Sequence, residues 1–219
     1  MRLLNPFLIC SCLFLASCAN TGIYGEIGEN LLRIFKQDKD ISKEVVNSVP
    51  YASMQVRLGN SDNALIVLEE DRGNFLKWTS SNLLKIYTQE GLIVKFSGLD
   101  NSLDLIELDR EHPIITKNFS DIDKRTFTSF YSFKNPNLYR LPVQTEITFL
   151  GEEEIVVLDE KIKTKKYQEK SLKNLINWRF KNTYWIKEDG FSLIKASQSV
   201  TPKTPKVHYM KLKKYKKPD

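Results

Sequence analysis

Cysteine is scarce in this chain, with three residues among 219, at positions 10, 12 and 18. Cys10 and Cys12 fall in an N-terminal segment that we predict to be removed, and Cys18 is a predicted modification site. The remaining chain then has no thiol for a disulfide or a Cys-based zinc site. We therefore expect packing alone to stabilise the fold, even in an oxidising compartment.

Histidine and glycine are also scarce, with two His and nine Gly. A Ser-His-Asp triad would need His112 or His208, and surface or turn positions explain both more simply. The chain has no Gly-x-Ser-x-Gly elbow, no P-loop and no Gly-rich dinucleotide fingerprint. We predict a protein that is not an enzyme, with no catalytic residue, metal or cofactor.

Paired carboxylates are the one catalytic arrangement that composition leaves open. A glycosidase needs two of them about 5 to 10 Å apart, and the chain has 27 acidic residues. Spacing alone does not select a pair. The first positions to consider are Asp100, Asp104, Asp121 and Asp123, and a periplasmic glycan hydrolase stays as the less favoured alternative.

Long apolar runs are missing too. Leu3 to Phe14 is interrupted by polar residues and proline, and it is shorter than the roughly 20 residues that a transmembrane helix needs. It follows Met1-Arg2 and leads into Leu15-Ala16-Ser17-Cys18, the order of a lipoprotein signal peptide. The alternatives are an ordinary signal peptide with a chance Cys or a short anchor helix. We predict removal of residues 1–17 and acylation of Cys18 with chains such as palmitate, which anchor a protein stably when there are two or more.

The charge balance is modestly basic, with 33 Lys and Arg against 27 acidic residues. Five lysines crowd residues 211–219, which we interpret as a basic C-terminal tail. A secreted protein does not meet cytoplasmic nucleic acid, so we predict no nucleic-acid partner. The tail either contacts anionic headgroups or acidic polysaccharide or is simply a solvated segment.

Residue patterns predict a mainly β protein. We expect a lipidated tether at 18–27, a short N-terminal helix at 29–37, a further helical turn at 42–48, and one β-rich periplasmic domain over 28–210. Short apolar runs with turn signals every 8 to 12 residues or so indicate an antiparallel meander that forms a barrel or a sandwich. A helical or irregular crossing is expected near 99–113, and the acidic run 152–154 is expected at a turn. Strands are expected at 52–58, 63–69, 75–79, 83–88, 92–97, 126–133, 142–150, 154–159, 161–170, 183–187, 191–199 and 206–214.

The C-terminal half carries an ordered set of motifs. Asn182-Thr183-Tyr184-Trp185 leads through a turn at Gly190 to Ser197-Gln198 and Pro202, and an earlier strand ends in Trp78-Thr79-Ser80. Together with the lipoprotein box, this order resembles the YjbF/GfcB family of lipoproteins. The resemblance covers essentially all of the chain after residue 17.

Several expectations follow from this resemblance. The family is encoded with exopolysaccharide or group 4 capsule export genes, and its members are regarded as β-rich outer-membrane lipoproteins without established catalytic activity. It implies a non-enzymatic accessory in polysaccharide secretion or assembly, with polysaccharide and export proteins as partners. The residue after Cys18 is Ala19 and not Asp, which favours sorting of the lipoprotein to the outer membrane. We expect the folded domain to face the periplasm.

The motif residues have a structural and a binding interpretation. In the first, Asn182 and Gln198 satisfy buried backbone groups near the 187–190 hairpin, and Trp185 packs on the core between them. In the second, Trp78, Trp178 and Trp185 stack on sugar rings. An alternative function is a lipid or lipoprotein carrier whose cavity is lined by aromatic residues, namely Phe127, Tyr131 and Phe133.

Overall fold

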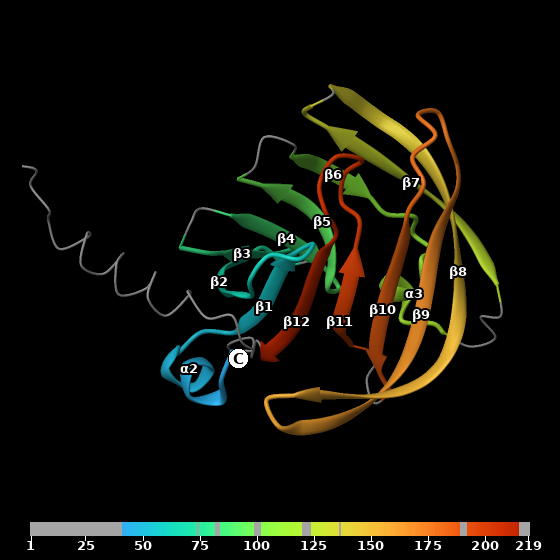
Figure 1. The fold of residues 1–219 in the computed structure, drawn as a ribbon. Helices are drawn as coiled ribbons and strands as arrows, with labels where there is room; N and C mark the ends of the chain where they lie inside the picture. The colour runs from blue at the N-terminus through green and yellow to red at the C-terminus, as the bar shows by residue number, and fades with distance from the viewer. Residues whose placement is uncertain are drawn as a thin grey trace, which may run out of the picture.

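The computed structural model describes residues 41–214, except 74, 82–83, 99–101, 120–123, 136 and 189–191. Its strands form one closed antiparallel barrel in which neighbours along the chain pair and β1 also pairs with β12 (Figure 1). The mainly β prediction is confirmed, and of the two expected architectures the chain adopts the barrel. The strands are β1 (Ser53–Leu58), β2 (Ala64–Asp71), β3 (Leu76–Thr79), β4 (Lys85–Gln89), β5 (Leu92–Ser97), β6 (Leu103–Glu107), β7 (Arg125–Phe133), β8 (Leu138–Val157), β9 (Glu160–Asn174), β10 (Lys181–Lys187), β11 (Leu193–Gln198) and β12 (Val207–Lys213).

Alternation of side chains along the strands fills the barrel interior. Successive residues of a strand point to opposite faces, so Met54 and Val56 of β1 lie in the core while Gln55 and Arg57 stay partly exposed. The predicted hairpin between β4 and β5 turns at Glu90 and Gly91, both with positive φ, as a tight hairpin requires.

The predicted crossing near 99–113 is wrong in its main part. Residues 103–107 form strand β6, which pairs with β7 and is part of the barrel wall. Among the described residues that follow β5, the helical part before β7 is α3 (Pro113–Thr116), whose first residue is a proline. The closely spaced leucines resemble a helical face. A register shift lies between Leu103 and Leu105, so Leu103 and Ile106 are buried while Leu105 is exposed.

The acidic run 152–154 lies within a strand, not at a turn. Strand β8 is continuous through Val157, with a register shift at Gly151, where φ is 127°. On β9, Lys165 and Lys163 lie opposite Glu152 and Glu154, and Glu154 also forms an ion pair with Lys161 at 2.9 Å. Opposite charges on paired strands stabilise the ladder, so three consecutive glutamates do not interrupt it.

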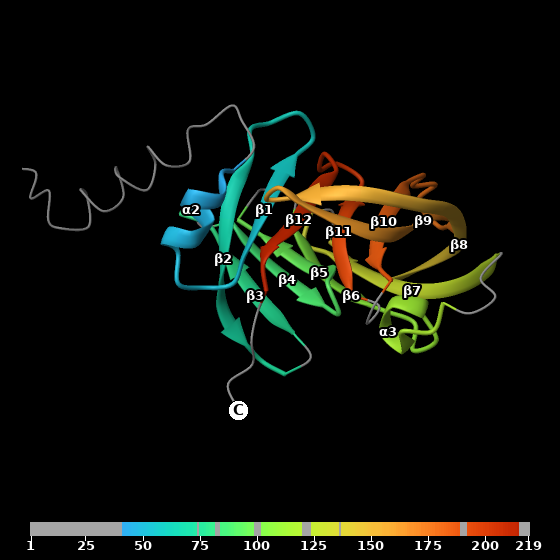
Figure 2. The same cartoon turned by 90° about the horizontal axis from the view of Figure 1, so that it is seen from below.

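The far ends of β8 and β9 form an arm that leaves the barrel wall. Figures 1 and 2 show this hairpin curving away and crossing β10, β11 and β12 toward α2. Ile155 and Val157 of the arm pack with Trp185 and Ile194 in a second apolar cluster, separate from the main core. The arm therefore covers part of the outer face of the barrel.

The N-terminal helix α2 (Lys43–Ser48) matches the predicted turn at 42–48 and is capped by Ser42. The expected helix 29–37, tether 18–27, signal 1–17 and Cys18 lie outside the described residues. Strand β12 continues to Lys213, so residues 211–213 belong to the barrel, not to the predicted tail. Within the described ranges, no helix has the length and apolar character to cross a membrane.

Candidate functional site

The motif residues lie on both sides of the barrel wall. On β10, Asn182 is completely buried and faces inward, and on β11 Gln198 faces inward and is also buried. Trp185 and Ser197 lie on the alternate, outer side of these strands. Gly190 falls outside the described residues, and Pro202 is exposed in the turn that follows β11.

Inside the barrel, Asn182 is part of a buried polar network. Its Nδ2 donates to Glu169 Oε2 at 2.9 Å, and the Tyr184 hydroxyl donates to the same oxygen at 2.5 Å. Its Oδ1 accepts from the backbone N–H of Ser199 at 2.8 Å. Burial, followed by the Glu169 charge, raises the pKa of Tyr184 well above its ordinary value. Tyr184 therefore stays a neutral donor to the carboxylate.

Gln198 forms a second contact between motif and backbone. Its side chain accepts from Ile93 N–H at 3.0 Å and donates to Ile93 C=O at 2.8 Å. Both amides bond to backbone, but at the ends of β10 and β11 away from the hairpin after Lys187. The contacts thus lie at the opposite end of the strands from the position expected.

Trp185 lies outside the main core. It belongs to the apolar cluster beneath the β8–β9 arm, with 9% of its surface exposed. The ammonium groups of Lys195 and Lys166 lie 4.7 and 5.1 Å from its ring centre, within the range of cation–π attraction. The arm and these lysines leave only a small part of the ring available to a ligand.

A lateral pocket of about 560 Å³ opens on the outer face of β1, β12, β11 and β10. Arg57 and Lys195 supply cations, and His208 and other polar side chains of the same strands lie around them. Among its described lining residues none is Asp or Glu. The remaining lining residues are Gln55, Asn63, Val156, Thr183, Trp185, Ala196, Ser197, Tyr209 and Met210.

His208 reports the electrostatics of this lateral pocket. Burial lowers its pKa, and the charges of Arg57, Lys206 and Lys195 lower it further. A neutral imidazole is therefore favoured until an anion enters. Of these residues only His208 was considered from the sequence, as a surface or turn position. Strand alternation, together with the pairing of β12 with β1 and β11, places Arg57, Lys195 and His208 on one outer face.

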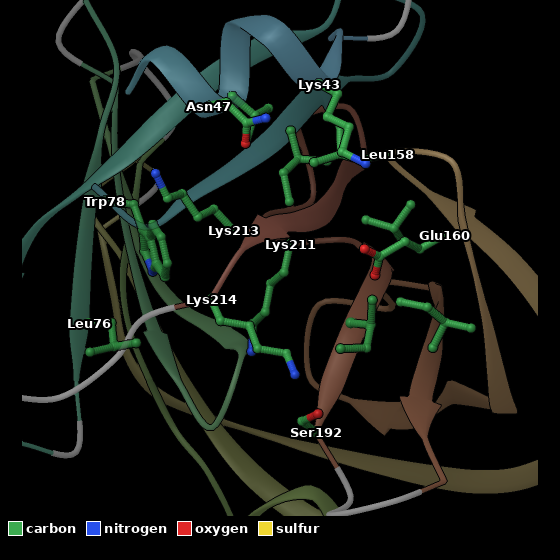
Figure 3. Close-up of a pocket in the computed structure, with 15 residues that line it drawn as sticks. Lys43, Asn47, Leu76, Trp78, Leu158, Glu160, Ser192, Lys211, Lys213 and Lys214 are labelled. Carbon is green, nitrogen blue, oxygen red and sulfur yellow. The ribbon is translucent and has the colours of Figure 1, made fainter. Parts of the chain in front are cut away.

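The second pocket, here called the end pocket, has a volume of about 540 Å³. Figure 3 shows Lys43 and Asn47 of α2, Trp78 of β3, Leu158 at the tip of the arm and lysines of the β12 end around one opening. Trp78 itself is 2% exposed and donates from Nε1 to Thr88 Oγ1 at 2.9 Å. It offers the end pocket an apolar wall and has no free polar atom on its ring.

The remaining candidate residues do not converge. His112 is 1% exposed and accepts from Ile114 N–H as the cap of α3, so the predicted surface or turn position is wrong in its exposure. Asp104 lies 3.9 Å from Lys95 on the surface. Three other carboxylates, those of Asp100, Asp121 and Asp123, lie outside the described residues.

The aromatic residues proposed to line a lipid cavity belong to the packed core. Phe127, Tyr131 and Phe133 are each at most 5% exposed. Tyr131 and Phe133 meet the Trp178 ring edge-on at 5.5 and 5.8 Å. The expected position of such a cavity is therefore wrong. Within the described part of the chain, no three His, Cys, Asp or Glu side chains are grouped to hold a metal ion.

Two lipoproteins of Escherichia coli (strain K12) match most of the chain. The uncharacterized lipoprotein YjbF is 25% identical over 199 residues, which cover 85% of this chain and 87% of YjbF. The uncharacterized lipoprotein GfcB is 21% identical over 182 residues, which cover 80% of this chain and 81% of GfcB.

The fold also has a solved counterpart. The crystal structure of the hypothetical lipoprotein YmcC from Escherichia coli (K12) aligns with a TM-score of 0.69 at 19% identity, covering 89% of this chain and 97% of YmcC. The family described as "Group 4 capsule polysaccharide lipoprotein gfcB, YjbF" matches residues 19–212. The resemblance seen in the motifs is thereby confirmed, and the chain belongs to the YjbF/GfcB family of group 4 capsule polysaccharide lipoproteins.

Proposed function

We propose that this chain is a periplasm-facing lipoprotein, anchored in the outer membrane through acylated Cys18, that assists capsule or exopolysaccharide secretion without catalysing a reaction. The observation that carries the proposal is the family match over residues 19–212. The lipoprotein box and Ala19 support the anchor and its destination.

The lateral pocket supports contact with the exported glycan. Its cations, amides and hydroxyls can pair with the carboxylates and hydroxyls of an acidic polysaccharide, and its lining among the described residues carries no competing acid. Arg57 supplies a planar donor group suited to carboxylates. Trp185 would touch a sugar only along an edge, because the arm covers most of its ring.

The roles of the buried ionisable groups support a non-enzymatic protein. His112 is used to cap α3, and Glu169 accepts from Asn182 and Tyr184 inside the barrel. These groups are committed to internal hydrogen bonds. The cations of the lateral pocket suit binding of an anion better than proton transfer.

The test is calorimetry of the Cys18→Ser chain with polysaccharide from producing cells. We expect binding that weakens about tenfold or more in an Arg57→Gln/Lys195→Gln double variant, because each lost charge–carboxylate contact costs about 1 kcal/mol. Lys203→Gln is the matched control, because Lys203 is exposed in the segment after β11 and does not line the lateral pocket. Equal binding by the double variant would refute glycan contact at the lateral pocket.

A cellular experiment tests the accessory role. Deleting the gene should reduce surface polysaccharide while precursors are still made, and the Cys18→Ser chain should not restore it fully. Unchanged surface polysaccharide in a producing strain would contradict the proposal. In that case, a crosslink between this chain and an export protein would not be evidence for an accessory role.

A further inference from the structure

We propose that the end pocket binds one anionic lipid, with its acyl chain against the apolar lining and its charged head among the lysines. This ligand is distinct from the polysaccharide proposed for the lateral pocket, and the two pockets are formed by different residues. The inference rests on the proposed anchoring at a membrane and not on glycan binding.

The apolar part of the end pocket is suited to a hydrocarbon chain. It is formed by Trp78 together with aliphatic residues of β3, the arm, β11 and β12, namely Leu76, Val157, Leu158, Ile162, Ile194 and Leu212. Its 540 Å³ falls within the roughly 300 to 1,000 Å³ of pockets that bind small molecules. Such pockets are mostly apolar with a few well-placed polar groups.

The charges around the pocket select an anion. Four lysines contribute to its lining, against one acid, Glu160. Lys43 of α2 and Lys214 after β12 are exposed at the rim. Lys213 already donates to the backbone oxygen of Val49 at 2.5 Å, so it holds the rim in place.

Lys211 is the cation that lies deepest. It is half-buried beside Gly91 and Leu193, and in the described part of the chain it forms no ion pair within 4.0 Å. The nearby Glu90 is paired with Lys117 at 3.1 Å. A buried ammonium without a counterion is costly, and the head of an anionic lipid would supply one.

The position of the pocket is consistent with a lipid source. Helix α2 forms one rim, and the described chain begins at Ile41, two residues before it. Lys43, in this rim, lies 25 positions after the predicted Cys18 anchor along the chain. Figure 3 shows the lysines and the apolar side chains around the same opening.

The test uses calorimetry of the Cys18→Ser chain, so that no attached acyl chain competes. Three probes separate the contributions: myristoyl lysophosphatidylglycerol, myristoyl lysophosphatidylcholine and glycerol phosphate. We expect the first to bind at least tenfold more tightly than either of the others. Equal binding of the two lysolipids would overturn the requirement for an anion, and equal binding of glycerol phosphate would overturn the requirement for a chain. An absence of binding by all three would overturn the site.

Surface variants locate the site without endangering the fold. Lys43→Gln/Lys214→Gln should weaken the anionic lysolipid about 10- to 25-fold, since each lysine near an anionic head contributes about fivefold. Lys203→Gln should leave the affinity unchanged. The Arg57→Gln/Lys195→Gln variant should also bind the lysolipid normally, which separates failure of this site from failure of glycan binding. Normal affinity in the Lys43→Gln/Lys214→Gln variant would overturn the assignment.

Discussion

Gln198 and Ile93 lie 105 positions apart in the chain, yet the amide of Gln198 bonds to both the N–H and the C=O of Ile93. The contact joins β11 to β5, which are not neighbours in the barrel. A side chain thus supplies the backbone pairing that a neighbouring strand would otherwise give. Because Gln198 is 2% exposed and Ile93 is fully buried, water does not substitute for this contact.

Gln198→Met should lower the free energy of unfolding by about 2 to 4 kcal/mol, because two buried backbone groups lose their partner. Methionine keeps nearly the same volume, so a cavity contributes little. Urea unfolding measures the change. Gln144→Met, an exposed glutamine on β8, is the control, and equal stability of the two variants would show that the contact is dispensable.

Tyr184→Phe should cost about 1 to 3 kcal/mol, because the Glu169 carboxylate loses a close buried donor. Asn182→Ala should cost at least as much, since it breaks the bonds to Glu169, Tyr184 and the Ser199 N–H. The double variant should cost less than the sum of the two, because both residues share the Glu169 oxygen. Strict additivity in urea unfolding would contradict a shared network.

Arg57→Gln should raise the pKa of His208, because the Arg57 charge is the largest neighbouring contribution after burial. The measurement is an NMR titration of the His208 ring, with His112 as an internal reference. Arg125→Gln, an exposed arginine on β7, should leave the pKa unchanged. Acidic polysaccharide bound in the lateral pocket should raise it as well, and an unchanged titration with saturating glycan would place binding elsewhere.

The strands were predictable from sequence where apolar and polar residues alternate between clear turns. Strand β5 matches its predicted bounds, and β7 matches the predicted strand 126–133 with one more residue at its start. The errors occur where tertiary pairing overrides local pattern. Strand β6 is formed by a leucine-rich run that gains its conformation from β7.

The candidate site was less predictable than the fold. From the sequence, the tryptophans and the motif amides were the candidate site residues. The two pockets, however, are formed where strands distant in the sequence and the arm come together. Lys211 falls in both the predicted strand 206–214 and the predicted basic tail 211–219; β12 carries it, with its ammonium group near Gly91. The spacing of residues along the chain does not predict such long-range contacts.

Ile155→Ala should loosen the β8–β9 arm while leaving the barrel folded. Ile155 is 5% exposed in the cluster with Val157, Trp185 and Ile194, and removing buried methylenes costs about 2 to 5 kcal/mol when the cavity stays. Hydrogen exchange should rise locally in the arm. Val156→Ala, one residue along and 58% exposed, should have little effect. Equal exchange in both variants would show that the arm does not depend on this cluster.

Lys211→Met should raise the free energy of unfolding below pH 8. Above pH 8, it should reduce the dependence of that free energy on pH. Burial lowers the pKa of Lys211 from 10.5 to about 8, the Glu90 charge opposing this and Lys117 adding to it. Between these two values the unfolded chain binds more protons than the folded chain, so this group makes stability rise with pH in that window. Below it, the buried charge is a constant cost, which the variant removes.

The expected gain below pH 8 is about 1 to 3 kcal/mol, because one pKa unit corresponds to about 1.4 kcal/mol and Lys211 keeps some solvent contact. Urea unfolding at steps from below pH 8 to pH 10.5 measures it. Buried tyrosines such as Tyr184 and Tyr209 have raised pKa values, so they make stability fall with pH near pH 10. This contribution is the same in variant and parent and cancels in the difference between them. Lys203→Met is the exposed control. A difference that stays constant with pH would mean that Lys211 titrates normally, and the end pocket would then have no uncompensated cation to offer an anionic head.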